Sequence, residues 1–233
     1  MDLNIKDVAE LLSVSETRVR KWLSRGLIPA YRLNQEFRFS RIEIESWVMN
    51  RKIEDDETDS TEATWTGTQQ YSLYRAIHKG DVLVGVEGCV KEDVIRDSMK
   101  QMAKTHEWDA GVFTDLLLDR ESLMPTALTN GIGVPHAREF LLPETFDVLS
   151  VVFPKEPIEY GALDGQKVHT LFFLFACQDK SHLHLLAKLA HLANSERALE
   201  YLKTKPEKNE LLTFIKSWES DVTSHSKLEV SAT

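Results

Sequence analysis

Residues 168–194 read VHTLFFLFACQDKSHLHLLAKLAHLAN, a run in which an apolar strand is followed at once by a helix. The part VHTLFFLFA is short and rich in aromatic and aliphatic residues, which favours a buried strand. We expect Ser181 to cap the helix, whose body is HLHLLAKLAHLAN. A second apolar run, VLSVVFP at 148–154, precedes this strand, and the turn-forming stretch YGALDGQ separates the two.

Helices and strands also alternate upstream of this region. The extended run VLVGV at 82–86 precedes a helix that begins near Lys91, and the next helix, GVFTDLLLDRESL, ends before Pro125. The alternation predicts an α/β domain over residues 69–217, here called the larger domain, with helices on the faces of a sheet. The inward positions of the first helix are Val94, Ile95, Ser98, Met99 and Met102.

One histidine of this domain lies in a segment that cannot be a regular helix. In NGIGVPHAR, residues 130–138, Gly131, Gly133 and Pro135 precede His136, so we expect His136 on a shaped loop.

Residues 1–52, here called the head, show a different pattern. Asn4 can cap a helix over IKDVAELL, Ser15 can cap the next one, and Gly26 can end it. Two short extended runs around Asn34 and Gln35 then predict a β-ribbon. Ser40 and Glu43 form a capping box for a third helix that buries Ile42, Ile44 or Trp47. This order is that of a winged helix-turn-helix, and the polar side chains available to a DNA groove are Thr17, Arg18, Arg20, Lys21 and Arg25, with Arg32 and Arg38 on the ribbon.

Charge divides the chain in the same way. The head has ten Lys and Arg against seven Asp and Glu, a net +3, whereas the remainder has eighteen against thirty, a net −12. Only the head therefore suits a polyanion. Residues 53–68 form an acidic linker, and 218–233 a flexible polar tail.

Several classes of protein are excluded by composition. No run approaches the ~20 apolar residues that cross a bilayer, and there is no signal peptide, so we expect no membrane insertion and a cytoplasmic protein. Cys89 and Cys177 lie far apart without CxxC spacing, which predicts two buried thiols and neither a disulfide nor a metal site. We expect no cofactor.

The head resembles a known type of DNA-binding module. The stretch LNIKDVAELLSVSETRVRKWLSRGLIPAYRLNQEFRFSRIEIESWV is similar to the small heads of the excisionase and MerR type. The resemblance implies that the second helix enters the major groove of duplex DNA and that the ribbon contacts phosphates. One module buries only ~600–1,000 Å² on DNA, so a homodimer is implied.

The larger domain resembles enzyme IIA of the fructose–mannitol and nitrogen-related phosphotransferase systems, called EIIA type 2. The similarity rests on LLLDRESLMPTALTNGIGVPHAR and ALDGQKVHTLFFLFACQDKSHLHLLAKLA. It implies that His136 carries a phosphoryl group and that Arg120 and His182 assist the transfer. A neutral imidazole nitrogen is a good phosphoryl acceptor, and such a transfer needs charge stabilisation and alignment more than covalent help. The glycines at 131 and 133 would let the backbone approach the phosphate. Because the chain has no P-loop and no kinase motif, the donor must be a partner. By the resemblance this donor is an HPr-like histidine phosphocarrier, and an EIIB or a regulatory target is the expected acceptor.

These observations predict a regulator that couples phosphorylation of His136 to DNA binding. The alternative is a plain phosphocarrier of a sugar-uptake chain whose head docks on proteins. Both hypotheses make the larger domain a phosphoryl-carrier phosphotransferase, and they differ in the partner of the head.

Overall fold

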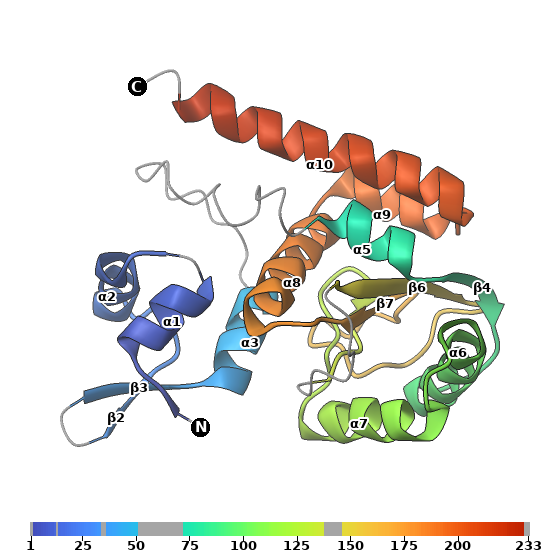
Figure 1. Cartoon of the computed structure of the whole chain (residues 1–233), viewed down its shortest axis with the longest axis horizontal. Coiled ribbons are helices and arrows are strands. Elements are labelled where there is room, and N and C mark those ends of the chain that lie inside the picture. The colour runs from blue at the N-terminus through green and yellow to red at the C-terminus, as the bar shows by residue number, and fades with distance from the viewer. Residues whose placement is uncertain (1, 13, 34–35, 51–71, 138–145, 231–233) are drawn as a thin grey trace.

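The structure is a computed structural model that describes residues 2–12, 14–33, 36–50, 72–137 and 146–230. The head contains the elements β1 (Asp2–Leu3), α1 (Ile5–Leu12), α2 (Glu16–Ser24), β2 (Tyr31–Leu33), β3 (Glu36–Ser40) and α3 (Arg41–Asn50) (Figure 1). Its three strands pair antiparallel in the order β1-β3-β2. The predicted ribbon is thus present, and β1 is an additional strand at its edge.

The helix boundaries of the head follow from its caps. The Oδ1 of Asn4 accepts hydrogen bonds from the backbone N–H groups of Lys6 and Asp7, at 2.8 and 3.0 Å, and Asp7 accepts one from the N–H of Asn4 at 2.9 Å. Ser15 caps α2, its Oγ accepting from the N–H of Arg18. The backbone turns away after α2 at Gly26, whose φ of 65° favours glycine. These three predictions are confirmed.

The larger domain is a mixed sheet between two helical layers, as the sequence predicted. Its strands are β4 (Val82–Val86), β5 (Ile132–Gly133), β6 (Val148–Pro154) and β7 (Thr170–Phe175), in the order β4-β6-β7-β5. The β6–β7 pair is antiparallel, whereas β4–β6 and β5–β7 are parallel. The helices are α5 (Leu73–Lys79), α6 (Lys91–His106), α7 (Ala110–Leu123), α8 (Asp179–Ala193), α9 (Glu196–Lys203) and α10 (Lys208–Val230).

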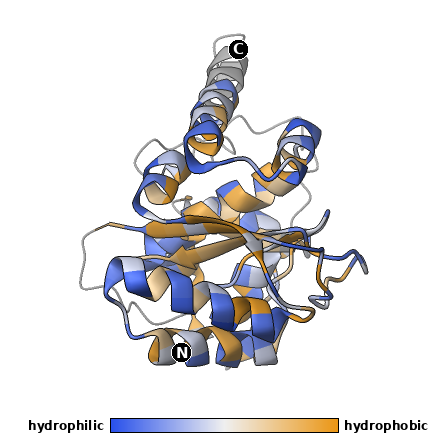
Figure 2. Cartoon of the chain, turned by 90° about the vertical axis from the view of Figure 1, so that its right-hand side faces the viewer, coloured by the Kyte–Doolittle hydropathy of each residue, from blue (hydrophilic) through white to orange (hydrophobic). Residues whose placement is uncertain are grey.

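The two faces of the sheet bury separate apolar clusters. On β6, Leu149, Val151 and Phe153 pack on the side of α5, α8 and α10, while Val148 and Val152 pack on the side of α6 and α7. This alternation is that of a strand buried on both faces. Figure 2 shows the apolar strands between the two helical layers. Among the described residues, no helix is both long and apolar enough to cross a membrane.

Three local predictions were wrong. Helix α8 begins at Asp179, and Ser181 is not its cap, since its hydroxyl donates to Asp147 at 2.6 Å. Cys89 is exposed and Cys177 is only half-buried, so neither is a buried thiol. Helix α10 continues to Val230, through the stretch from residue 218 that was expected to be a tail. The linker prediction for 53–68 lies outside the described residues.

Candidate functional site

His136 follows β5 on a short segment that the sheet holds in place. The N–H of Leu174 in β7 donates to the carbonyl of Pro135 at 2.9 Å, and His136 itself forms a single bridge to Leu174. The Nδ1 of His136 lies 2.7 Å from the carbonyl oxygen of Val134. Because a carbonyl only accepts, Nδ1 carries a proton, so that in the neutral form of the ring the lone pair lies on Nε2.

His182 and Arg120 lie beside this histidine. The ring of His182, in the first turn of α8, meets the ring of His136 edge-on, with centroids 5.1 Å apart. Arg120 comes from the last turn of α7 and donates through Nη1 to the carbonyl of Met124 at 3.0 Å. The pKa of His182 is well below its usual 6.5, first because of burial and then because of the nearby His136, Arg41 and Arg120. His182 is therefore neutral at pH 7.

Several buried polar atoms of this cluster lack a hydrogen-bond partner. The Nε and Nη2 atoms of Arg120 and the Nε2 of His182 are buried, and none has a hydrogen-bond partner within the described part of the chain. Buried polar groups are nearly always hydrogen-bonded, and a buried guanidinium calls for negative charge. A phosphoryl group beside His136 would supply acceptor oxygens to Arg120 in a two-pronged geometry.

A network below the cluster fixes the end of α7. Glu121, next to Arg120 in the sequence, accepts hydrogen bonds from the backbone N–H and hydroxyl of Thr126 and from the hydroxyl of Tyr160. All three side chains are buried, and burial together with the charge of Glu121 raises the pKa of Tyr160 well above 10.0. The network ties the end of α7 and the segment after it to the segment between β6 and β7, so it positions Arg120.

Two charged residues of the head complete the site, and neither was predicted. Glu45 of α3 is fully buried: its Oε1 accepts from the Nε of Arg41 at 2.9 Å, and its Oε2 lies 4.0 Å from the Nε2 of His136. Arg41 also pairs with Asp179 of α8 at 2.7 Å. Burial alone would lower the pKa of Arg41, but the hydrogen bonds to Asp179 and Glu45 raise it above its ordinary value.

The glycines before His136 allow close packing of the loop. A Cβ on Gly131, whose φ is 77°, would meet the ring of His169, and a Cβ on Gly133 would meet Leu171. Protein atoms therefore occupy the space beside both glycines. They allow the loop to pack closely on His169 and Leu171, and the expectation that the backbone approaches a phosphate here stays a prediction.

The residues expected at DNA differ in how far they are available. Arg18 is a correction, because only 8% of it is exposed and its guanidinium lies over the ring of Trp22, 5.4 Å from the centroid. Arg38 is half-buried and pairs with Glu36 at 2.7 Å. The remaining candidates are exposed or, for Lys21, half-buried: Thr17, Arg20, Lys21, Arg25 and Arg32.

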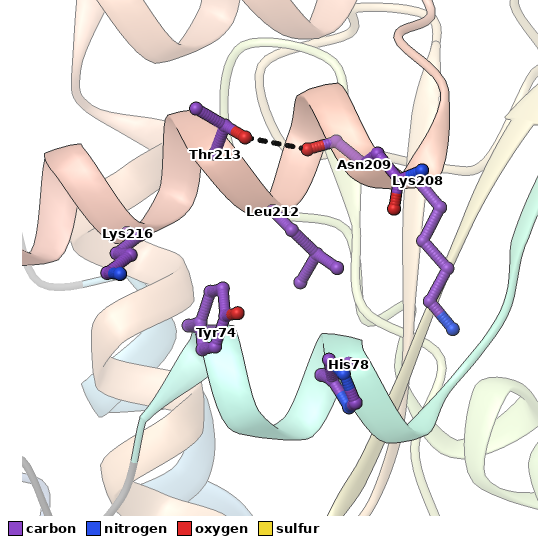
Figure 3. A pocket seen from close by; sticks show the side chains of 7 residues that line it. All are labelled: Tyr74, His78, Lys208, Asn209, Leu212, Thr213 and Lys216. Atoms are coloured by element: carbon purple, nitrogen blue, oxygen red, sulfur yellow. Dashed lines mark hydrogen bonds between the residues drawn. The ribbon is translucent and has the colours of Figure 1, made fainter.

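A pocket of about 660 Å³ lies elsewhere, between α5 and α10 (Figure 3). Figure 3 shows Tyr74 and His78 on α5 facing Leu212, Lys208 and Lys216 on α10. None of the residues around His136 lines this pocket, so it is separate from the candidate site.

The fold and the site together define a two-part protein, with a helix-turn-helix head and an α/β domain that carries a His–His–Arg cluster. The family model described as "Phosphoenolpyruvate-dependent sugar phosphotransferase system, EIIA 2" matches residues 76–218, and one described as "Helix-turn-helix domain" matches residues 3–52. The first match spans more than half of the chain, which therefore belongs to the EIIA type 2 family.

Individual relatives agree with this assignment. A nitrogen regulatory protein of Pseudomonas aeruginosa is 30% identical over 137 residues, which are 58% of this chain and 88% of the relative. The fructose-specific EIIABC component of Bacillus subtilis is 28% identical over 134 residues, 53% of this chain but 20% of that protein. The crystal structure of the nitrogen regulatory protein IIA-Ntr of Neisseria meningitidis has the same fold, with a TM-score of 0.52 and 23% identity over 59% of this chain and 93% of that one.

Proposed function

We propose that this chain is a regulator in which His136 accepts a phosphoryl group from an HPr-like histidine phosphocarrier, and in which this state is coupled to DNA binding by the head. The observation that carries the proposal is the hydrogen bond from Nδ1 of His136 to the carbonyl of Val134. In the neutral ring it leaves Nε2 as the nucleophile, and the same cluster contains donors of Arg120 that have no hydrogen-bond partner among the described residues.

The transfer is a displacement at phosphorus. The lone pair of Nε2 attacks the phosphorus of the donor's phosphohistidine, and the donor's N–P bond breaks, its electron pair returning to the donor ring. The proton on Nδ1 stays in place, and the carbonyl of Val134 stabilises the positive charge that develops on the ring. Arg120 neutralises the equatorial oxygens, and neutral His182 can donate one hydrogen bond to them. Onward transfer to an EIIB or a regulatory target would reverse these steps.

The test is phosphorylation in a defined mixture. The protein is incubated with phosphoenolpyruvate, enzyme I and HPr, and the modified residue is mapped by mass spectrometry. We expect one acid-labile phosphoryl group on His136, lost in His136→Ala and acquired slowly in His182→Asn. His78→Asn, at an exposed position on α5, is the matched control and should behave as the parent. Undiminished labelling of His136→Ala would refute the assignment.

The DNA part of the proposal rests on the head. Its fold is a helix-turn-helix with a basic excess, and α2 presents Thr17, Arg20 and Arg25 to solvent. Since one small module buries little DNA surface, we propose binding as a homodimer. Both partners, phosphocarrier and DNA, place the protein in the cytoplasm. Salt-dependent binding to duplex DNA supports this hypothesis, whereas a head that binds only proteins would favour the plain phosphocarrier.

A further inference from the structure

The head covers the candidate phosphoryl site. We infer that α3 occupies the surface that a phosphoryl donor must use, with the carboxylate of Glu45 in the place of the incoming phosphoryl group. The docked head and phosphorylation of His136 then exclude each other. This inference rests on the proposed role of His136, and it adds to that role a partner within the same chain.

The first step is that the head is packed on the larger domain. Both α3 and α1 contact α8, and Figure 1 shows α3 between the rest of the head and α8. The buried apolar residues of the head and those of α8 form one continuous cluster. Arg41 adds a polar clamp, since it reaches Asp179 of α8 and Glu45 of its own helix together.

The second step is steric. Heavy atoms about 3.5–4.0 Å apart are already in contact, so the 4.0 Å between Oε2 of Glu45 and Nε2 of His136 leaves no room for a phosphorus atom. The ring of His136 is also fully buried, so no donor can approach Nε2 in line. Transfer therefore requires that α3 leave the site.

The third step is electrostatic. A phosphoryl group carries roughly −1.5 to −2 charge near neutral pH, and on Nε2 it would face the buried carboxylate of Glu45 at contact distance. Like charges in a buried site repel strongly. Phosphorylation would thus expel α3, and by linkage a docked α3 must oppose phosphorylation by the same coupling free energy.

The docked carboxylate is also held incompletely. The Oε2 of Glu45 has no hydrogen-bond partner among the residues the structure describes, although it is fully buried. An unsatisfied buried acceptor destabilises the docked state, and this penalty is removed when the head moves away and water hydrates the carboxylate. The docked state is therefore poised for release by a local change of charge.

The first experiment measures access to His136 without phosphotransfer. Diethyl pyrocarbonate acylates neutral imidazole, and mass spectrometry resolves the rate at His136 in the full chain. The test variant is Glu45→Lys, which replaces the carboxylate beside Arg41 by a cation. The control is Glu43→Lys, the same substitution at an exposed position of the same helix. We expect acylation at least ten times faster in Glu45→Lys and within twofold of the parent in Glu43→Lys.

The same variants are then phosphorylated through HPr. A tenfold faster initial rate in Glu45→Lys, with Glu43→Lys unchanged, supports the inference. Equal acylation and equal phosphorylation in all three proteins overturns it while the proposed function stands. If no variant is phosphorylated, the proposed function fails, and acylation still reports whether α3 covers the site.

A second variant and a second measurement keep the inference testable if Glu45→Lys does not fold. Should Glu45→Lys fail to fold, Asp179→Lys disrupts the clamp from the larger domain, where Asp179 is 47% exposed. Hydrogen exchange provides the other readout: on phosphorylation of the parent protein, the amides of α3 and the first turns of α8 should exchange faster. Unchanged exchange in fully phosphorylated protein would overturn the expulsion of α3.

Discussion

The Oε2 of Glu45 in the head lies 4.0 Å from the Nε2 of His136 in the larger domain. This contact links the two domains directly. If Nε2 is the nucleophile, as we propose, a carboxylate of the helix-turn-helix head lies at the reacting atom, so that phosphorylation and the position of the head depend on each other.

Arg120 should govern the rate of transfer and not its site. We expect Arg120→Gln to slow phosphorylation of His136 by about 10²–10³, the usual cost of removing one donor from a developing negative charge. The modified residue should still be His136. Initial rates with phosphorylated HPr measure the effect, and Arg96→Gln, an exposed arginine on α6, is the control. Equal decreases in the two variants would indicate a general effect of lower positive charge.

The protonation of His182 should affect how the free energy of unfolding varies with pH. The folded protein lowers the pKa of His182 well below 6.5, so the unfolded chain binds this proton more readily. Stability from this residue is complete above about pH 6.5 and falls as the pH falls below that value. The groups facing the ring are His136, Arg41 and Arg120, with Glu45 beyond His136.

The measurement is the denaturant midpoint between pH 8 and pH 5. In His182→Asn the midpoint should change less over this range than in the parent, because one source of proton uptake on unfolding is gone. His78→Asn, at an exposed position, should keep the parental slope. A parental slope in His182→Asn would show that its protonation does not oppose folding.

The sequence predicted the elements better than their contacts. The strands at β6 and β7 and the inward face of α6 follow from periodicity, because each element buries its own apolar side chains within one domain. The composition of the site on the larger domain followed from the family resemblance, and the structure does bring His136, His182 and Arg120 together.

The contribution of the head could not be predicted in this way. Glutamate is almost never fully buried unless paired, so nothing in the pattern around Glu45 distinguishes it from the exposed Glu43. Its burial arises from docking between two domains, which depends on surface shape and not on local periodicity. Arg18 was misplaced for a related reason, since its long side chain packs on Trp22 from a position that helical spacing assigns to the polar face.

The C-terminal part of α10 was predicted wrongly because its polar composition gave no sign that Glu219 holds this helix to the rest of the domain. Glu219 accepts hydrogen bonds from Lys188 at 2.8 Å and from the hydroxyl of Ser72 and the N–H of Leu73 at the start of α5. One carboxylate therefore joins α8, α10 and the cap of α5. The composition from residue 218 onward is that of a tail, but this carboxylate is structural.

We expect Glu219→Ala to destabilise the protein by about 3 kcal/mol, the order found when one partner of a buried ion pair is removed. The Nζ of Lys188 would be deprived of this carboxylate, and its side chain is only 4% exposed. Asp221→Ala is the control on the same helix, since its pair with Arg197 is exposed and should contribute less than about 1 kcal/mol. Denaturant unfolding measures both, and equal values would contradict the anchoring role.

DNA binding should depend on the exposed cations of the head. Each phosphate that the protein ceases to neutralise reduces the slope of log affinity against log salt by about 0.9. We expect Arg25→Ala and Arg32→Ala each to reduce the slope by about this amount and to weaken binding on all sequences alike. Arg197→Ala, on the larger domain, is the control. Binding that does not vary with salt would favour a protein-docking head.

The last prediction concerns the coupling of the two activities. In the docked state α2 still exposes Thr17, Arg20 and Arg25, so docking does not bury the expected DNA surface. It does hold the larger domain against the head, and residues 69–217 of that domain have seventeen Lys and Arg against twenty-one Asp and Glu, a net −4. Release of α3 lets the negatively charged larger domain move away from DNA. We therefore expect phosphorylation to raise the affinity for DNA at low salt. A coupling free energy of the usual size corresponds to a change of about fivefold or more.

Glu45→Lys and Glu43→Lys separate release from charge. Both variants add the same charge to the head, but only Glu45→Lys replaces the carboxylate at His136. Unphosphorylated Glu45→Lys should bind DNA as tightly as the phosphorylated parent or more so, and Glu43→Lys should gain only the small effect of its added charge. The comparison is made at fixed salt, with His136→Ala exposed to the same donors as the unphosphorylated reference. If Glu45→Lys and Glu43→Lys bind DNA with the same affinity, and phosphorylation does not change the affinity of the parent protein, the two domains are not coupled.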